Sequence, residues 1–358
     1  MAATTRTIDA LMLGLALPLL LAACGPREAT LPVTKQPPRA VPVEVLPLDG
    51  PAAASDAEIS AMCWCGDRLV LMPQHPERYG DRRGELGLFV LDRAEVVAAI
   101  DDPATRPLVP RRAVLHAPDL IASLPGWDGI EAVVAVGDTV FVAVEARVND
   151  RMAGYLLRGR LRPTATEPRL DLDTERVAPI PVPTMVDNMS QEALVITGDR
   201  VAVLFEANGV HVNPGAHVAL FDFELAYQGT RPIEHVEYRI TDACRARPDG
   251  TFWVMNYFFP GEGRTLAPPV VPTVPVEHLL ELRLGPDGVV RSGRPPLDLR
   301  HDPGAPARNW EALVRLDGRG FLLMTDRYPE TMLAFVPWTD ADQADHAVAA
   351  PRPAGDDR

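Results

Sequence analysis

Residues 130–138 read IEAVVAVGD, residues 191–199 read QEALVITGD and residues 310–318 read WEALVRLDG. Each stretch places an acidic residue and an alanine before a short apolar run, and a tight-turn pair follows the run. A second apolar run then leads to another acidic residue, which is Glu145, Glu206 or Asp326. Short apolar runs separated by such turns are typical of β-hairpins. We therefore interpret the three segments as copies of one hairpin.

Two weaker copies follow the same frame. Residues 60–67 read SAMCWCGD and lead to Gln74, and residues 242–250 read DACRARPDG and lead to Asn256. A third apolar run follows every hairpin, and a fourth follows four of the five. Units of four antiparallel strands, repeated along a chain, are the blades of a β-propeller. The sequence thus predicts an all-β chain with five blades, and six blades are the alternative because the first interval is long.

The fifth unit ends near Trp338 without a fourth strand, whereas residues 40–46 (AVPVEVL) form an apolar run with no hairpin of their own. Propellers close their ring by lending a terminal strand to the last blade, which removes an exposed edge. We therefore expect the N-terminal strand to complete the fifth blade. The propeller domain should span residues 41–340, followed by a disordered tail at 341–358, where the apolar pattern is lost.

The N-terminus carries an apolar run at residues 11–21, followed by Ala22, Ala23 and Cys24. Such a run is too short to cross a bilayer and predicts a signal peptide over residues 1–23. The LAAC sequence at 21–24 resembles the lipobox of bacterial lipoproteins. The resemblance implies export, lipidation of Cys24 and anchoring in a membrane, and Gly25 favours the periplasmic face of the outer membrane. Residues 24–40 would be a lipidated, proline-rich tether.

Composition narrows the possible partners. The formal net charge of −14 argues against nucleic acid as a partner and is compatible with cation binding. Beyond Cys24, the cysteines are Cys63, Cys65 and Cys244. We expect buried, free thiols, although a disulfide between two of them is open in an oxidising compartment.

The repeat also predicts a ring of polar side chains. One residue starts the innermost strand of each blade, and these five residues are Ser60, Glu131, Glu192, Asp242 and Glu311. Converging carboxylates raise one another's pKa unless a cation compensates them, and Ca²⁺ prefers ligands of this kind. The sequence therefore predicts a central calcium site. It leaves open that these side chains only face a water-filled channel.

A second register position lies at the end of the next strand, facing the same mouth. Its members are Gln74, Glu145, Glu206, Asn256 and Asp326. We take Glu145, Glu206 and Asp326 as candidate catalytic residues because they would lie beside the metal. Basic residues in loops at this mouth are candidates for binding an anionic substrate: Arg82, Arg147, His211, Arg264 and Arg327. The long loop from Tyr257 to Pro275 could add an aromatic surface.

Five blades that begin with Ser60, Glu131, Glu192 and Glu311 on one register resemble the calcium-dependent apyrase family, and more weakly the phytase-like and lactonase-like propellers. The resemblance implies Ca²⁺ on the propeller axis and hydrolysis of nucleoside diphosphates and triphosphates. Asp242 departs from it, because that family carries serine there.

Three functions follow as hypotheses. The first is a calcium-dependent hydrolase of an anionic, phosphorylated small substrate. The second is a non-catalytic propeller that binds a component of the cell envelope. The third is a five-bladed glycosidase, which would use two of the carboxylates as acid and base.

Overall fold

The computed structural model describes residues 36–80, 85–162, 168–265, 272–300 and 304–338. The signal peptide, Cys24, most of the tether, Arg82 and the tail lie outside these ranges. None of the helices in these ranges is long and apolar enough to span a membrane.

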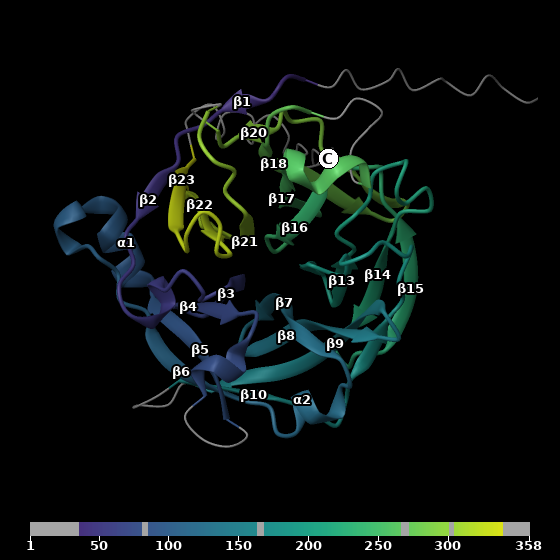
Figure 1. Ribbon diagram of the computed structural model, residues 1–358, viewed down its shortest axis with the longest axis horizontal. Coiled ribbons are helices and arrows are strands. Elements are labelled where there is room, and N and C mark those ends of the chain that lie inside the picture. Colours follow the sequence, from purple (N-terminus) through teal and green to yellow (C-terminus); the bar gives the residue numbers. More distant parts are fainter. Residues whose placement is uncertain (1–35, 81–84, 163–167, 266–271, 301–303, 339–358) are drawn as a thin grey trace, which may run out of the picture. The chain divides into compact units, whose positions relative to one another are not determined.

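The strands form four hydrogen-bonded sheets, which make up five blades around a common centre (Figure 1). Blade 1 consists of β3 (Ile59–Cys65), β4 (Arg68–Pro73), β5 (Glu85–Asp92) and β6 (Arg111–His116). Blade 2 consists of β7 (Trp127–Val136), β8 (Thr139–Val148), β9 (Arg151–Arg162), β10 (Arg169–Leu172) and β11 (Ala178–Ile180). Blades 1 and 2 are joined at their outer edges, where β10 runs parallel to β6.

Blade 3 consists of β12 (Ala193–Thr197), β13 (Arg200–Leu204), β14 (His217–Asp222) and β15 (Tyr227–Pro232). Blade 4 consists of β16 (Arg239–Ala243), β17 (Thr251–Phe258), β18 (Val276–Gly285), β19 (Gly288–Arg291) and β20 (Leu297–Asp298), and β1 (Arg39–Ala40) extends it in parallel with β20. Blade 5 consists of β21 (Trp310–Leu316), β22 (Gly320–Thr325) and β23 (Leu333–Pro337). The five-bladed prediction is confirmed.

The N-terminal strand closes the ring as predicted. β2 (Glu44–Leu46) pairs antiparallel with β23, so an N-terminal strand and the last described strand share one sheet. Leu46 is fully buried in this position. The fifth blade therefore gains its outer strand from residues almost 300 positions earlier in the chain, in the manner expected of propellers.

Each interface between neighbouring blades has its own apolar core. Separate clusters of buried side chains join blades 1 and 2, 2 and 3, 3 and 4, 4 and 5, and 5 and 1. The last of these holds Leu46, Phe89 and Leu322 together. Since burial of apolar surface is the main favourable contribution to folding, this closed set of interfaces fixes the ring.

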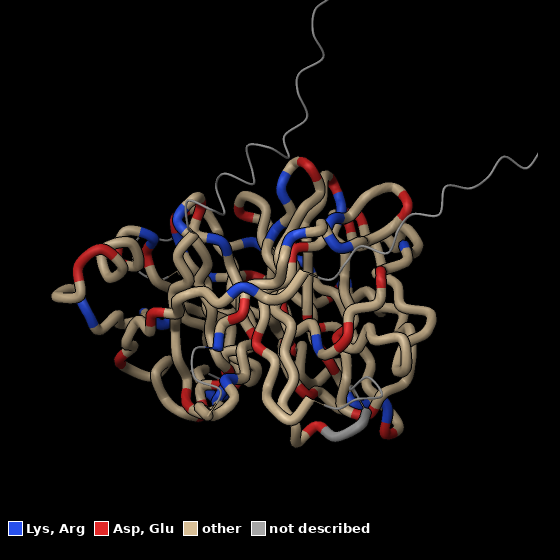
Figure 2. Tube along the Cα trace, turned by 90° about the horizontal axis from the view of Figure 1, so that it is seen from above, with Lys and Arg blue, Asp and Glu red and all other residues tan. Residues whose placement is uncertain are grey.

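Helices are short and lie outside the blades. They are η1 (Pro51–Ala53), η2 (Pro76–Tyr79), α1 (Arg93–Asp101), η3 (Pro103–Thr105), α2 (Leu120–Ser123) and η4 (Pro260–Thr265). In α1, the Glu95 carboxylate accepts a 2.8 Å hydrogen bond from the main-chain N–H of Asp92, which caps the helix. Charged residues of both signs are interspersed along the chain trace, many of them in connecting loops (Figure 2).

The hairpin turns repeat as well as the strands. Gly66, Gly137 and Gly198 follow the inner strands of blades 1, 2 and 3, and all have φ near +60°. Glycine adopts this left-handed conformation without steric cost, which explains its place in the repeat. Cys63, Cys65 and Cys244 are free and buried, as expected.

Candidate functional site

A β-bulge recurs at the start of the inner strand and decides which side chains face the axis. The pairing of the inner strand with the next strand shifts between Ile59 and Ala61, Ile130 and Ala132, Ile240 and Asp242, and Trp310 and Ala312. Bulges add an unpaired residue and redirect its side chain. The equivalent bulged residues are therefore Ser60, Glu131, Thr241 and Glu311, and Glu192 takes the same place before β12 in blade 3.

This register corrects two predictions in blade 4. Asp242 lies one residue beyond the bulge, and a one-residue shift turns a strand side chain to the opposite face. Its carboxylate is buried and accepts 2.7 Å hydrogen bonds from the main-chain N–H groups of Ala243 and Leu313. It therefore ties blade 4 to blade 5. The sequence placed Asp242 in the ring because Asp242–Ala243 resembles the acid–alanine step of the other blades.

Asn256 is displaced in the same way, since it pairs with Ile240. Its amide donates hydrogen bonds of 2.9 and 3.0 Å to the main-chain carbonyls of Glu237 and Arg239. Tyr257 follows it and holds the register position of Gln74, Glu145 and Asp326. This aromatic residue, which the sequence assigned to a loop, belongs to β17.

The two hydroxyl-bearing members of the ring join blades. Ser60 donates a 2.6 Å hydrogen bond to the main-chain carbonyl of Ile130, and Thr241 donates one of the same length to that of Trp310. Both side chains are buried. Each hydroxyl thus links its own blade to the next, at the equivalent residue in both cases.

The remaining ring residues line an axial cavity of about 600 Å³. Its described lining consists of Gln74, Glu131, Glu145, Asn188, Glu192, Arg239, Tyr257, Phe259, Ala307, Asn309, Glu311, Asp326, Arg327 and Tyr328. Five carboxyl groups, three amides and three aromatic rings thus surround one space. Ser60, Glu206 and Asp242 are not part of this lining.

Arg239 places a guanidinium group among the carboxylates. It binds Glu206 through Nε, and its Nη2 atom lies 3.5 Å from a carboxylate oxygen of Glu192 and 3.5 Å from one of Glu311. Glu262 of η4 lies 3.2 Å from Nη1. Burial lowers the pKa of Arg239, but these carboxylates outweigh burial and raise it well above its usual value. A cation therefore already compensates the converging carboxylates.

Glu131 and Glu145 form a second group of coupled acids. Burial raises the pKa of Glu131 well above its usual value, and the charges of Glu145 and Glu192 raise it further. Burial also raises the pKa of Glu145, which a hydrogen bond from Glu131 opposes. A protonated Glu131 thus donates to Glu145, while the Gln74 amide donates a 2.9 Å hydrogen bond to Glu131 Oε1.

Glu311 and Asp326 pair within blade 5. Burial, followed by the charge of Asp326, raises the pKa of Glu311 to about 8, against the opposing charge of Arg239. The Asn309 amide donates a 2.6 Å hydrogen bond to its carboxylate. The pKa of Asp326 is also raised by burial, but Arg327 opposes that shift. At neutral pH Glu311 therefore holds a proton beside a second carboxyl group in a different environment, an arrangement that acid–base chemistry uses.

Two of the arginines predicted to bind substrate, Arg147 and Arg327, are already paired with carboxylates. Arg147 donates a 2.9 Å hydrogen bond to Asn188 and lies 3.4 Å from Asp187. His211 is exposed and lies outside the cavity lining. Arg264 belongs to η4, and Arg82 lies outside the described residues. Only Arg327, among these predicted residues that the structure describes, lines the cavity.

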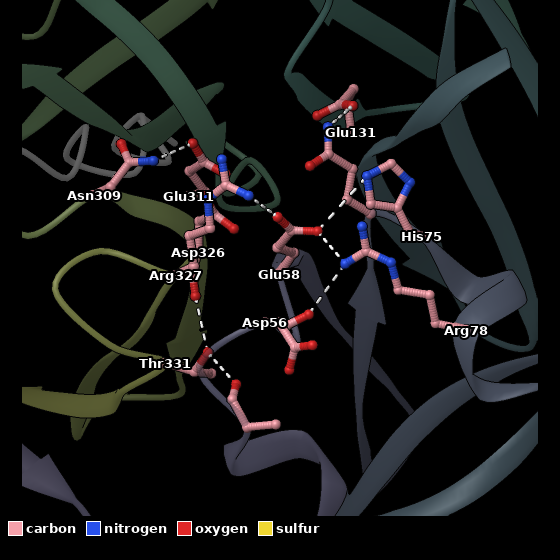
Figure 3. A network of polar contacts seen from close by, with 12 residues as sticks. Asp56, Glu58, His75, Arg78, Glu131, Asn309, Glu311, Asp326, Arg327 and Thr331 are labelled. Atoms are coloured by element: carbon pink, nitrogen blue, oxygen red, sulfur yellow. Dashed lines mark hydrogen bonds and ion pairs between the residues drawn. The ribbon is translucent and has the colours of Figure 1, made fainter.

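Glu58 holds the outer side of the cavity together (Figure 3). This buried residue has a φ of 47° and binds both Arg78 and Arg327, while His75 Nε2 lies 3.6 Å from it. Figure 3 shows its carboxylate between the two guanidinium groups, which come from blades 1 and 5. Arg327 is therefore already held in an ion pair with Glu58, a carboxylate that it shares with Arg78.

The predicted calcium ligands do not fit together as a site. The hydroxyl of Ser60 and the carboxylate of Asp242 are used by main-chain groups, and Arg239 occupies the space between Glu192 and Glu311. A divalent cation there would be repelled by the guanidinium group. Among the described residues, no three His, Cys, Asp or Glu side chains are grouped to hold a metal ion.

Two important residues, Arg239 and Glu58, escaped the sequence reasoning, and Tyr257 was expected only as part of an aromatic loop. Arg239 and Glu58 each stand two residues before the bulged residue of their blade, outside the acid–alanine pattern that defined the repeat. Aligning blade 4 on Thr241 in place of Asp242 would have put Tyr257 at the position of Gln74, Glu145 and Asp326.

Comparisons with known proteins were made on the sequence and on the fold. No family model and no curated protein matches the sequence. Among solved structures, a GH43 endo-arabinanase from Bacillus licheniformis is 10% identical with a TM-score of 0.46, covering 83% of this chain and 98% of the other. An exo-1,5-alpha-L-arabinanase from a bovine ruminal metagenomic library is 10% identical with a TM-score of 0.46, covering 80% and 94%.

A GDP-Man-dependent mannosyltransferase from Leishmania mexicana is 11% identical with a TM-score of 0.43, covering 83% of this chain and 90% of the other. Likenesses at this level leave the function to be argued from the site itself.

Proposed function

We propose that this propeller is a glycoside hydrolase that acts on an uncharged sugar in the axial cavity. The observation that carries the proposal is the pair of Glu311 and Asp326, two carboxyl groups that line the same cavity, of which Glu311 has its pKa raised to about 8. Hydrolysis of a glycosidic bond uses a carboxylic acid and a carboxylate in this way.

The charges of the cavity favour a neutral ligand over an anionic one. Five carboxyl groups line the cavity, and its two arginines are already bound by Glu206 and Glu58. A phosphate group would therefore meet five carboxyl groups, and both guanidinium groups of the lining are already engaged with carboxylates. This argues against a phosphorylated substrate and in favour of hydroxyl groups, which hydrogen-bond to carboxyl and amide groups alike.

The aromatic residues support the same substrate class. Tyr257, Phe259 and Tyr328 line the cavity beside the carboxyl groups. Phe259 and Tyr328 leave 40% and 58% of their surface exposed, so their rings are available for contact. The apolar faces of sugar rings pack on such side chains while the hydroxyl groups bind the polar ones.

The proposed reaction needs only residues of this chain and water. Glu311 donates its proton to the glycosidic oxygen as the bond from that oxygen to the anomeric carbon breaks. Asp326 acts either as base, taking a proton from the water whose oxygen bonds to the anomeric carbon, or as nucleophile, forming an ester at that carbon that water then cleaves. Glu145 is the second candidate for that role. Glu206, which the sequence also proposed, is fully buried beneath Arg239 and is better suited to hold that arginine.

The test is hydrolysis of chromogenic glycosides of pentoses and hexoses by the full-length protein, beside Glu311→Gln and Asp326→Asn. Wild type should release product from at least one sugar, and both variants should lose a hundredfold or more of kcat, about the share that general acid–base catalysis supplies. Asp199→Asn is the matched control, because that side chain is 92% exposed in a hairpin turn.

A folded wild type that hydrolyses no glycoside would contradict the proposal. Binding of sugars without turnover would favour the non-catalytic propeller. If Glu311→Gln is as active as wild type, Glu311 is not the general acid.

A further inference from the structure

A second cavity lies at the other end of the propeller axis. The axial cavity is lined by the starts of the inner strands, including Glu131 and Glu311, whereas the second is lined by their later residues. Its lining includes segments 62–64, 133–135, 243–248 and 313–315 from four blades, and its volume is about 410 Å³. Because equivalent inner strands run in the same direction, the two cavities open at opposite mouths.

The charge of this second cavity is the reverse of the first. Four guanidinium groups line it, those of Arg93, Arg245, Arg247 and Arg315, against the single carboxylate of Asp317. The whole chain carries a formal net charge of −14, so a basic cavity stands out. Side chains of one sign gathered in a concave site attract ligands of the other sign.

Among the residues that the structure describes, two of these arginines, Arg245 and Arg315, have no carboxylate partner. Arg93 lies 2.8 Å from Asp317, and Arg247 is bound by Glu281. Arg245 is exposed and forms no hydrogen bond or ion pair with the residues that the structure describes. Within the same ranges Arg315 meets no carboxylate; its Nη2 atom donates only to the main-chain carbonyl of Asp317, at 3.2 Å.

The interior of this cavity also contains an unused donor. The Nε atom of Arg315 is buried and has no hydrogen-bond partner in the described structure. Leaving a buried donor of a charged group unpaired is costly. Burial lowers the pKa of Arg247, and although Glu281 opposes this, the positive charge of Arg315 lowers it further. Both arginines line the same cavity, and their positive charges oppose each other.

We infer that this mouth binds a small oxyanion, such as a phosphate or carboxylate group, between Arg315 and Arg247, with Arg245 closing over it. Guanidinium groups bind such anions through paired hydrogen bonds. An anion there would satisfy the free donor of Arg315 and offset the repulsion between the two arginines. The site is separate from the proposed active site, so its ligand would act as an effector or a tether to a phosphate-bearing partner.

The test uses inorganic phosphate as the probe and the full chain at low ionic strength. Calorimetry should detect one phosphate per chain, weakened by added sodium chloride. Trp64 lines this cavity and donates a 2.8 Å hydrogen bond to the main-chain carbonyl of Arg315, so tryptophan fluorescence should change on binding. The double variant Arg245→Gln, Arg315→Gln should bind at least tenfold more weakly.

Arg151→Gln is the matched control, because Arg151 is exposed at the start of β9 and lines neither cavity. If the double variant fails to fold, the exposed Arg245→Gln alone must still weaken binding severalfold. The inference is overturned if folded wild type shows no saturable binding, if Arg245→Gln and the double variant bind as wild type, or if the control weakens binding equally.

A further arm distinguishes free phosphate from a lipid headgroup. Vesicles of phosphatidylglycerol and of phosphatidylcholine are compared with wild type and the double variant. Binding that requires both the anionic lipid and the two arginines, and that inorganic phosphate displaces, identifies the headgroup; phosphate binding without it identifies the free anion.

Discussion

The carboxylate of Glu311 lies 3.5 Å from Nη2 of Arg239, so an acid and a guanidinium group from neighbouring blades meet on the propeller axis. Yet the pKa of Glu311 is raised to about 8, because burial and Asp326 together outweigh the arginine. The cavity thus keeps a protonated carboxyl group at neutral pH without losing its compensating cation.

The first prediction concerns pH. If protonated Glu311 is the acid, kcat should fall as the pH rises through about 8, where that proton is lost. Glu311→Gln should be slow at every pH and lack this alkaline limb. The measurement is a pH–rate profile on the best chromogenic glycoside, and an unchanged limb in the variant would assign it to another group.

The second prediction concerns the stability supplied by Arg239. Arg239→Met leaves Glu192, Glu206 and Glu311 without their cation, and removing one partner of a buried ion pair costs about 3–5 kcal/mol. Protonation relieves the remaining carboxylates, so the deficit should shrink from pH 8 to pH 5. Urea denaturation at both pH values measures it, with Arg151→Met as the control; a deficit that does not vary with pH would contradict this account.

The third prediction follows from the raised carboxyl pKa values of the wild type. Glu131, Glu192 and Glu311 bind protons more tightly in the folded state than their usual values allow. Such groups contribute stability below the unfolded pKa and lose it as the pH rises towards the folded one. The free energy of unfolding should therefore decrease from pH 5 to pH 8, and Glu131→Gln should flatten that decrease. A curve as steep as that of wild type would contradict it.

The fourth prediction is that the Thr241 hydroxyl contributes to stability and not to catalysis. Thr241→Val removes the hydrogen bond to Trp310 and should cost about 1 kcal/mol of stability. It should leave kcat within twofold of wild type, because the hydroxyl joins blades and does not line the cavity. Thermal unfolding and glycoside kinetics measure both effects. A large loss of kcat with intact stability would place Thr241 in the reaction instead.

The fifth prediction concerns calcium, which the sequence placed on the propeller axis. Calorimetry should detect no stoichiometric Ca²⁺ binding to wild type, since Arg239 occupies the axis; binding abolished by Glu192→Gln would overturn this.

The N-terminus can be tested separately. Cys24→Ala should release the protein from the membrane fraction of a bacterial host if the lipobox is used. If the variant stays in the membrane fraction, the prediction of a lipid anchor at Cys24 is wrong.

The sequence by itself determined the architecture. Apolar runs with glycine turns specify hairpins locally, and their repetition specifies blades, so the pattern predicted five blades, with six as the alternative, and the strand that closes the ring. It also located Glu131, Glu192 and Glu311 on one register, since each stands before an alanine at the start of the same hairpin. The export signal and Cys24 lie outside the described residues and stay predictions.

Only the tertiary structure decided the chemistry of the axis. Blade 4 lacks the Glu–Ala step. Its register is shifted by one residue, so Thr241 and Tyr257 take the positions that the sequence assigned to Asp242 and Asn256. The counter-charge was likewise hidden, because Arg239 precedes the repeat and meets Glu311 only when blades 4 and 5 pack together. Local pattern fixes which face of a strand a residue takes, whereas the charge balance of a cavity depends on which blades converge on it.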